Sequence, residues 1–193
     1  MGKHSGEEKK TSAAREALSW VFCISVAILV ALLLRIFVFE LVMVQGESME
    51  HTLHNGQTVF VEKVSRNFGN LSRRQIVIVK YPGREGAFVK RIVGLPGDTI
   101  EVKEGALYVN DVRQDEPYIV EPYILQDFAR VTVPEDCYFV MGDNRNNSMD
   151  SRDPTVGAIP FDQVIGHAMF VIWPLSDMQG RIRNRRWLSG RTL

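Results

Sequence analysis

Two residues of this sequence, a serine and a lysine, could together carry out nucleophilic chemistry. Ser48 stands in the polar stretch GESMEHTL, and a serine hydroxyl becomes a nucleophile only when a base takes its proton. Lys90 stands within the alternating apolar pattern of VKRIVGLPGD. Burial lowers the pKa of a lysine, and the neutral amine can then act as a general base. The sequence offers four candidate general bases for the Ser48 hydroxyl: Lys90, His51, His54 and His167.

Each of these residues also has an ordinary structural explanation. A lysine on an edge strand discourages aggregation, and a serine in a loop usually belongs to a turn or cap. His51 follows Ser48 by three positions, a spacing that would bring the two side chains together on a helical turn. His51 and His54 lack convincing further ligands, so we predict no metal site.

A third polar stretch, GDNRNNSMDSR (142–152), follows a fully apolar segment. Its acidic and amide side chains can satisfy local backbone donors. Ser148 could instead hydrogen-bond an active-site lysine. Asp150 could pair with Arg152 or Arg91, and either pair would help to fix the segment that carries Lys90.

Short segments rich in β-branched and aromatic residues separate these polar stretches, with turn signals such as Asn55-Gly56 and Pro96-Gly97 between them. Beyond the N-terminal region, no segment shows sustained helical periodicity. We therefore predict an all-β domain of hairpins and antiparallel sheets over residues 45–178. The predicted strands are 58–64, 75–81, 87–94, 99–105, 106–110, 137–142 and 167–173.

One N-terminal segment is long and apolar enough to cross a membrane. Leu18 to Leu34 carries no charge, a span needs about 20 mostly apolar residues, and Arg35 can extend to the headgroups. Bulky residues after it disfavour a signal-peptide cut. We predict a polar leader over 1–15 and a transmembrane anchor over 16–44. The excess of Lys and Arg before the span places the N-terminus in the cytoplasm and the β domain outside.

Charge and cysteine usage exclude some classes. Lys+Arg and Asp+Glu number 23 each, so net charge gives no argument for nucleic acid as a partner. Cys23 and Cys137 fall in different parts of the chain and are not expected to pair, and no Cys-x-x-Cys motif indicates zinc. The arginine-rich tail, 179–193, either contacts anionic lipid headgroups or is a solvated terminus.

In this order behind an N-terminal anchor, GESMEHTL, VKRIVGLPGD and GDNRNNSMDSR closely resemble the motif blocks of bacterial type I signal peptidases in their compact, single-anchor form. The resemblance covers roughly residues 17 to 175. It implies a membrane-bound serine endopeptidase with a Ser–Lys dyad, which removes signal peptides after small residues at the −1 and −3 positions. By position, Ser48 would be the nucleophile and Lys90 the general base. No cofactor is implied, because this acyl transfer needs none.

The resemblance also implies supporting roles. Ser148 would orient the lysine amine, and the backbone N–H of Ser48 would donate to the oxyanion. A supporting ion-pair cluster would consist of Asp150, Arg152 and Arg91. The shallow substrate pockets would be lined by Val44, Leu53 and Val89. The implied partners are signal peptides of secreted preproteins, the phospholipid bilayer and the secretion translocon, at the outer face of the cytoplasmic membrane.

Two positions depart from the usual pattern of the family. His51 stands where proline is usual, so the turn after Ser48 is expected to differ. Gly46 stands where some members carry a hydroxyl residue as a second oxyanion donor, which leaves that donor unassigned. Two alternatives stay open: a dedicated Ser–Lys processing protease with a narrow substrate set, and a catalytically silent, membrane-anchored assembly factor.

Overall fold

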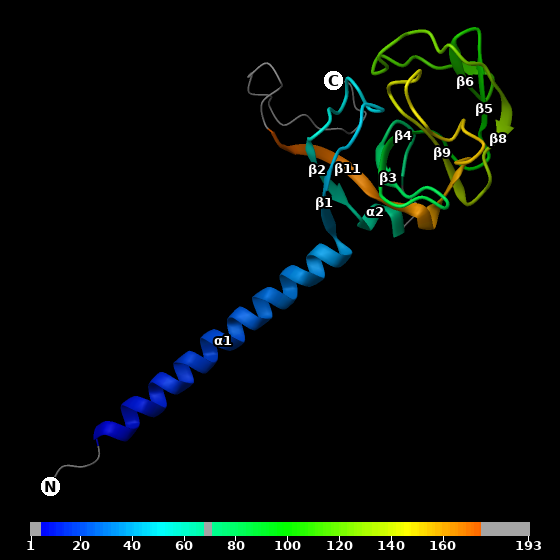
Figure 1. The fold of residues 1–193 in the computed structure, drawn as a ribbon. Helices are drawn as coiled ribbons and strands as arrows, with labels where there is room; N and C mark the ends of the chain where they lie inside the picture. The colour runs from blue at the N-terminus through cyan, green and yellow to red at the C-terminus, as the bar shows by residue number, and fades with distance from the viewer. Residues whose placement is uncertain (1–4, 68–70, 175–193) are drawn as a thin grey trace. The chain divides into compact units, whose positions relative to one another are not determined.

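The computed structural model describes residues 5–67 and 71–174. The chain divides into a helical unit that ends at Val38 and a β-rich unit that begins at Phe39 (Figure 1). The prediction of one N-terminal helix followed by an all-β domain is confirmed. The predicted end of the β domain at 178 and the arginine-rich tail lie outside the described residues.

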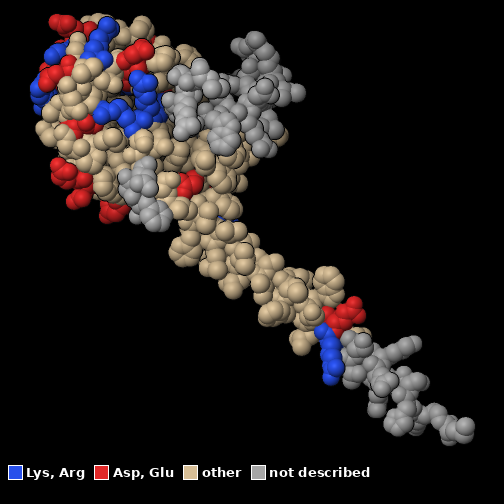
Figure 2. Space-filling model, turned by 180° about the vertical axis from the view of Figure 1, so that it is seen from behind, with Lys and Arg blue, Asp and Glu red and all other residues tan. Residues whose placement is uncertain are grey.

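Helix α1 runs from Ser5 to Phe37. Its part from Arg15 to Phe37 has the length and apolar composition needed to cross a membrane. Between Glu16 and Arg35 it carries no charged residue, so most of this part is tan in Figure 2. The predicted anchor, 16–44, needs correction at its C-terminal end, because the segment long and apolar enough to cross a membrane is Arg15–Phe37. The helix begins earlier, within the predicted leader, and it ends seven positions sooner.

The residues after the helix form strand β1, Phe39–Met43. Leu41 and Met43 are exposed, whereas Val42 packs against the core, which is the two-residue alternation of a half-buried strand. β1 pairs antiparallel with β2, Thr58–Glu62. This pairing satisfies the backbone groups of the segment, so the chain has no need to extend the helix there.

Seven strands form one antiparallel sheet in the order β1-β2-β11-β3-β4-β9-β10. The last strand among the described residues, β11, therefore lies between β2 and β3. The helix α2 (Val64–Asn67) follows β2, and a single 3-10 turn (Phe161–Gln163) precedes β11. The remaining strands of this sheet are β3 (Ile76–Val79), β4 (Phe88–Gly94), β9 (Cys137–Met141), β10 (Ile159–Pro160) and β11 (Val164–Trp173).

Four further strands form a second antiparallel sheet in the order β7-β6-β5-β8. They are β5 (Thr99–Lys103), β6 (Ala106–Val109), β7 (Val112–Arg113) and β8 (Phe128–Thr132). All seven predicted strands are present, although their ends differ from the prediction by up to three residues. The strands β1, β7, β8 and β10 were not predicted.

Strand β4 is buried along almost its whole length because apolar clusters cover both of its faces. Val89 packs in one cluster, Phe88 and Ile92 in a second, and Val93 in a third. The side chain of Lys90 lies between those of Phe88 and Ile92 in the alternating order. The same alternation that buries its neighbours therefore draws Lys90 out of water.

Candidate active site

Ser48 lies in the loop that joins β1 to β2. The two ends of this loop are joined by a backbone hydrogen bond from Val44 N to Gln57 O at 2.7 Å. Next to it, Gly46 N donates to Asn55 Oδ1 at 3.0 Å. Gly46 has a φ of +87°, a conformation that glycine adopts at little cost. These two bonds join the two ends of the loop, and Ser48 lies between them.

A tight turn follows the serine. The carbonyl oxygen of Met49 accepts hydrogen bonds from the backbone N–H groups of Thr52 and Leu53, each at 2.8 Å. Met49 and Leu53 are fully buried, so this turn is fixed by packing as well as by its backbone. His51 is exposed, and the peptide bond that precedes it is cis.

Lys90 Nζ donates a hydrogen bond to Ser48 Oγ at 2.6 Å and another to the carbonyl oxygen of Val89 at 3.1 Å. Lys90 is only 3% exposed. Burial lowers the pKa of its amine to about 8, although the negative charges of Asp150 and Asp143 oppose the fall. At pH 7 about a tenth of such an amine is neutral. A neutral amine at this distance can accept the proton of the hydroxyl.

The structure thus brings together the two residues from which the sequence argument began. Among the described residues, no hydrogen bond joins Ser48 to His51, His54 or His167. His54 is bonded to Glu50 instead, at 2.5 Å. The lysine is therefore the base that the geometry offers to the hydroxyl.

The polar loop that follows β9 contacts the Ser48 loop from the other side. Asn144 N donates to Ser48 O at 3.0 Å, and Asn144 Nδ2 donates to Glu47 O at 3.2 Å. Gly142 lies so close that a Cβ atom on it would be 2.5 Å from Ser48 O and 2.2 Å from Ser148 Oγ. Only glycine allows the two loops to approach in this way.

The predicted ion-pair cluster is two separate pairs, each with a buried carboxylate. Arg152 pairs with Asp150, Nε to Oδ1 at 2.8 Å, and Asp150 Oδ2 also accepts the backbone N–H of Gly142 at 3.0 Å. Arg91 pairs with Asp143, Nε to Oδ1 at 2.7 Å and Nη2 to Oδ2 at 2.5 Å. The expectation that Arg91 belongs to the cluster of Asp150 is wrong.

The register of the sheet explains this difference. Arg91 on β4 lies opposite Met141 on β9, and Asp143 follows Met141 by two positions. The side chain of Asp143 therefore stays beside Arg91. Asp143 is fully buried, and a buried carboxylate needs a paired cation. The sequence signal for this role was the placement of Asp143 directly after an apolar strand.

Ser148 also departs from the expectation. Its Oγ is buried and has no hydrogen-bond partner among the described residues, so the expected bond to the lysine amine is absent. The amine of Lys90 is already bonded to Ser48 and to the Val89 carbonyl. Ser148 packs against Gly142 instead.

A residue pair that the sequence argument missed supports Gly142. Arg145 Nε donates to Gly142 O at 3.1 Å, and its Nη2 donates to Glu116 Oε1 at 2.6 Å. Both side chains of this pair are almost fully buried. No motif marks Glu116 in the sequence, and 29 positions separate it from Arg145.

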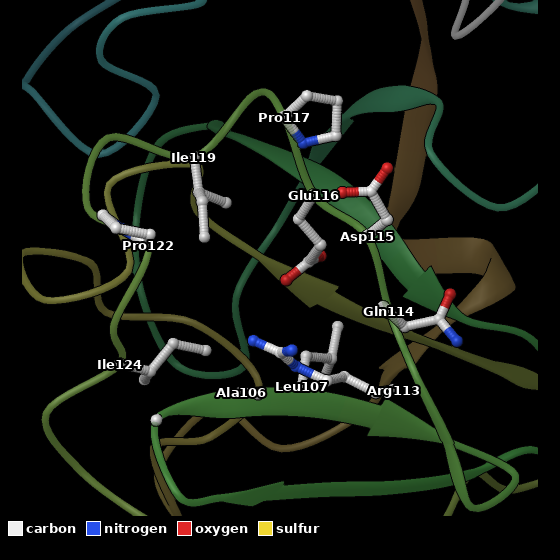
Figure 3. A pocket seen from close by; sticks show the side chains of 11 residues that line it. Ala106, Leu107, Arg113, Gln114, Asp115, Glu116, Pro117, Ile119, Pro122 and Ile124 are labelled. Carbon is white, nitrogen blue, oxygen red and sulfur yellow. The ribbon is translucent and has the colours of Figure 1, made fainter.

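Glu116 also lines a hollow of about 440 Å³ at β6, β7 and the loop that follows. Its side chain and those of Arg113, Ile119 and Ile124 point into this hollow (Figure 3). None of the predicted site residues lines it.

An open groove of about 470 Å³ surrounds Ser48 and Lys90. Its other lining residues are Gln45, Gly46, Glu47, Asn55, Phe88, Asn147 and Met149. The predicted pocket residues Val44, Leu53 and Val89 are not among them. They are 2%, 0% and 7% exposed and pack together in one apolar cluster, so in this structure they belong to the core.

The fold and this site together are those of a serine hydrolase whose β domain follows one apolar helix. The sequence matches the family described as signal peptidase, peptidase S26, over residues 17–173. The chain belongs to this family, as the resemblance of its motif blocks predicted. It is a hydrolase of the signal peptidase I type, a membrane-anchored enzyme that cleaves signal peptides.

Relatives match along nearly their whole length. Signal peptidase I of Bacillus licheniformis is 41% identical over 182 residues, which covers 90% of this chain and 97% of the relative. Signal peptidase I S of Bacillus subtilis (strain 168) is 39% identical over 183 residues, with 90% and 98% covered. Signal peptidase IB of Staphylococcus aureus (strain COL) is 33% identical over 182 residues, with 86% and 94% covered.

A solved structure also matches. It is a signal peptidase I from Enterococcus faecalis V583, which is 33% identical to this chain. The match covers 50% of this chain and 95% of the other, with a TM-score of 0.45.

Proposed function

We propose that the chain cleaves N-terminal signal peptides from exported preproteins by acyl transfer, with Ser48 as the nucleophile and neutral Lys90 as the general base. The observation that carries this proposal is the 2.6 Å contact between Lys90 Nζ and Ser48 Oγ. Burial holds the pKa of the amine at about 8, so its neutral form is available near neutral pH.

In acylation, Ser48 Oγ attacks the scissile carbonyl carbon while Lys90 Nζ accepts the hydroxyl proton. The lysine then gives this proton to the leaving nitrogen as the C–N bond breaks. In deacylation, Lys90 takes a proton from the attacking water and returns it to Ser48 Oγ as the ester bond breaks. Among the described residues, the backbone N–H of Ser48 has no acceptor, which leaves it free to donate to the developing oxyanion.

The two ion pairs help to keep the pKa of Lys90 low enough for its amine to act as a base. Asp143 and Asp150 each raise the pKa of Lys90, but each carboxylate is paired with an arginine, Arg91 or Arg152. Pairing offsets the negative charge that the amine would otherwise experience. The pairs also tie β4 to the polar loop, so that Lys90 and the loop that contacts Ser48 stay together.

For specificity, we propose cleavage after small residues at −1 and −3. The resemblance to the family supports this preference, and it still assigns Val44, Leu53 and Val89 to the pockets. These side chains are buried together as the structure stands, so their contribution would be to limit the depth of the groove. A shallow site rejects large side chains by overlap.

For location, we propose that the β domain lies outside the cytoplasmic membrane and that the N-terminus lies inside. Lys3, Lys9, Lys10 and Arg15 precede the apolar segment, whereas no Lys or Arg occurs between Gln45 and Glu62. This asymmetry follows the positive-inside rule. The proposed partners are the lipid bilayer around α1 and the translocon that delivers preproteins.

The test is cleavage of a preprotein with an Ala-x-Ala site by the full-length chain in detergent, followed by N-terminal sequencing of the product. We expect one new N-terminus directly after the site, and no product from Ser48→Ala or Lys90→Met. The matched controls are Ser72→Ala and Lys80→Met, because both residues are exposed. Cleavage by either Ser48→Ala or Lys90→Met would rule out the proposed dyad. An inactive wild-type chain would favour an assembly factor, and cleavage of only one preprotein in a panel would favour a narrow processing protease.

A further inference from the structure

The side chain of Thr52 makes a long-range bond from the turn that follows the nucleophile. Thr52 Oγ1 donates to Asp143 Oδ2 at 2.5 Å, across 91 positions of sequence. Thr52 is 9% exposed and Asp143 is fully buried. The bond therefore joins the loop of Ser48 to the polar loop 142–152 within the protein interior.

The acceptor of this bond is itself fixed. Both carboxylate oxygens of Asp143 accept hydrogen bonds from Arg91. The third guanidinium nitrogen, Arg91 Nη1, donates to Arg74 O at 2.7 Å, and the guanidinium lies over the ring of Tyr118 at 4.0 Å from its centroid. A carboxylate held in this way cannot follow a moving donor. Since Arg91 is adjacent to Lys90 on β4, the bond links the nucleophile turn to the strand that carries the base.

Two consecutive residues of the polar loop thus hold the nucleophile segment at two points. Asn144 N holds the carbonyl oxygen of Ser48, and Asp143 holds the hydroxyl of Thr52. The second bond ends on an ionised acceptor, and such bonds are about twice as strong as neutral ones. Met49, between the two points, is buried in the core. The backbone that places Ser48 Oγ beside Lys90 therefore has little freedom to move.

We propose that Thr52 is a positioning residue for the cleavage reaction. Its hydroxyl fixes the turn after Ser48 to the Arg91–Asp143 pair and thereby sets the distance from Ser48 Oγ to Lys90 Nζ. It touches no substrate and transfers no proton. This inference rests on the proposed function, because it assumes that Ser48 is the nucleophile.

The experiment compares Thr52→Val, which has nearly the same shape without the hydroxyl, with Thr52→Ser, which keeps it. Both are made in the full-length chain in detergent, and kcat and KM are measured on the same preprotein. For Thr52→Val we expect kcat to fall about tenfold or more, because rate depends steeply on the geometry of the attacking atom. We expect KM to stay within about twofold, and Thr52→Ser to keep a kcat near that of the wild type.

The matched control is Thr99→Val. Thr99 lies on β5 in the smaller sheet, and its Oγ1 donates to Asn110 Oδ1 at 3.4 Å. This variant also loses a threonine hydrogen bond, but away from the residues that line the groove. We expect its kcat to equal that of the wild type.

The pH profile separates positioning from an electrostatic effect. Asp143 remains paired with Arg91 in Thr52→Val, so the midpoint of the rise of kcat/KM with pH should stay where the wild type has it. A hydroxyl that acted through the charge of Asp143 would instead shift this midpoint, and a higher pH would restore the rate. Such a shift would overturn the inference.

The other outcomes are also decisive. A kcat within twofold of the wild type for Thr52→Val, an equal loss for Thr52→Ser, or a loss confined to KM would each overturn the positioning role. Rates are compared per folded molecule, below the thermal transition of each variant. If Thr52→Val does not fold, Thr52→Ala takes its place. An active Ser48→Ala would refute the proposed function itself, whereas an inactive Ser48→Ala with an active Thr52→Val would refute only this inference.

Discussion

Lys90 Nζ and Ser48 Oγ lie 2.6 Å apart, at the point where an interior strand meets an open groove. Lys90 is buried on β4, between two apolar neighbours of the same face. Ser48 is half-buried in a loop that lines the groove. Lys90 is therefore kept out of water while its amine reaches a hydroxyl that a peptide can approach.

The pH dependence of cleavage should follow the titration of Lys90. Burial lowers its pKa from 10.5 to about 8, and the neutral amine is the proposed general base. The value of kcat/KM should therefore rise with pH, with a midpoint near 8, and level off above it. Initial rates between pH 6 and 10 provide the measurement. A maximum well below neutrality would show that a protonated group, and not a neutral lysine, is required.

Replacing Lys90 should stabilise the protein while it removes activity. The folded-state pKa is lower than the unfolded one, so the unfolded chain binds the proton more tightly than the folded chain does. The resulting loss of stability is complete below pH 8, where the buried amine carries its charge. The penalty decreases as pH rises from about 8 to 10.5. At pH 7, Lys90→Met should raise the free energy of unfolding by about 2 kcal/mol, allowing for its lost hydrogen bonds.

This stability gain can be checked by denaturant unfolding of the full-length chain in detergent, with the exposed Lys80→Met as control. The difference between the wild type and Lys90→Met should shrink as pH approaches 10. An unchanged or lower stability at pH 7 would mean that burial does not lower the pKa of this amine.

Gly142→Ala should reduce cleavage by about 100-fold. The added Cβ would lie 2.5 Å from Ser48 O and 2.2 Å from Ser148 Oγ, so the polar loop or the nucleophile loop must move, and a displacement near 1 Å is costly to rate. Gly166→Ala is the matched control, because its Cβ would lie 2.4 Å from Glu62 O on the far side of β3 from β4. It should lose stability but keep its kcat per folded molecule.

Breaking the Arg91–Asp143 pair should destabilise the fold more than removing both partners. Both side chains are at most 5% exposed, and a buried charge left alone costs about 3–5 kcal/mol. Arg91→Leu should therefore lower the free energy of unfolding by that amount, and adding Asp143→Leu should recover a large part of it. A double variant less stable than either single one would contradict this coupling. Thermal and denaturant unfolding supply the measurement.

His167 should make stability depend on pH in mildly acidic solution. Burial lowers its pKa, with Glu62 opposing the shift, and no partner is found for its Nε2 among the described residues. The unfolded chain then binds a proton near pH 6.5 that the folded chain does not, so stability is lost as pH falls below about 6.5. From pH 7 to pH 5, the free energy of unfolding of the wild type should fall relative to that of His167→Asn. A constant difference would show that His167 titrates normally.

Much of the fold followed from local patterns. Alternating apolar residues marked seven strands, and Leu18 to Leu34 marked the helix. The missed strand Phe39–Met43 lies directly after that apolar run, where composition alone cannot distinguish a helix from a strand. Its pairing with Thr58–Glu62 decided the matter, because a hydrogen-bonding partner was available on a strand that begins fifteen positions later.

Local sequence patterns could not predict which polar side chains pair with one another. Alternation along a strand places Lys90 and Arg91 on opposite faces, but it does not say which carboxylate each face meets. Arg91 meets Asp143 because β4 pairs with β9 at Met141. Arg145 meets Glu116 across a loop that carries no motif. These choices depend on register and on how two sheets and their loops pack.

By itself, then, the sequence determined the anchor, the β character of the domain and the chemical types in three polar stretches, because each depends on residues close together in the chain. Tertiary structure alone decided that Lys90 is hydrogen-bonded to Ser48 while Ser148 is not hydrogen-bonded to Lys90. It also decided that Thr52 and Asp143 belong to one network. Such contacts form between segments tens of residues apart, and their distances are set by strand register and close packing, which no local pattern records.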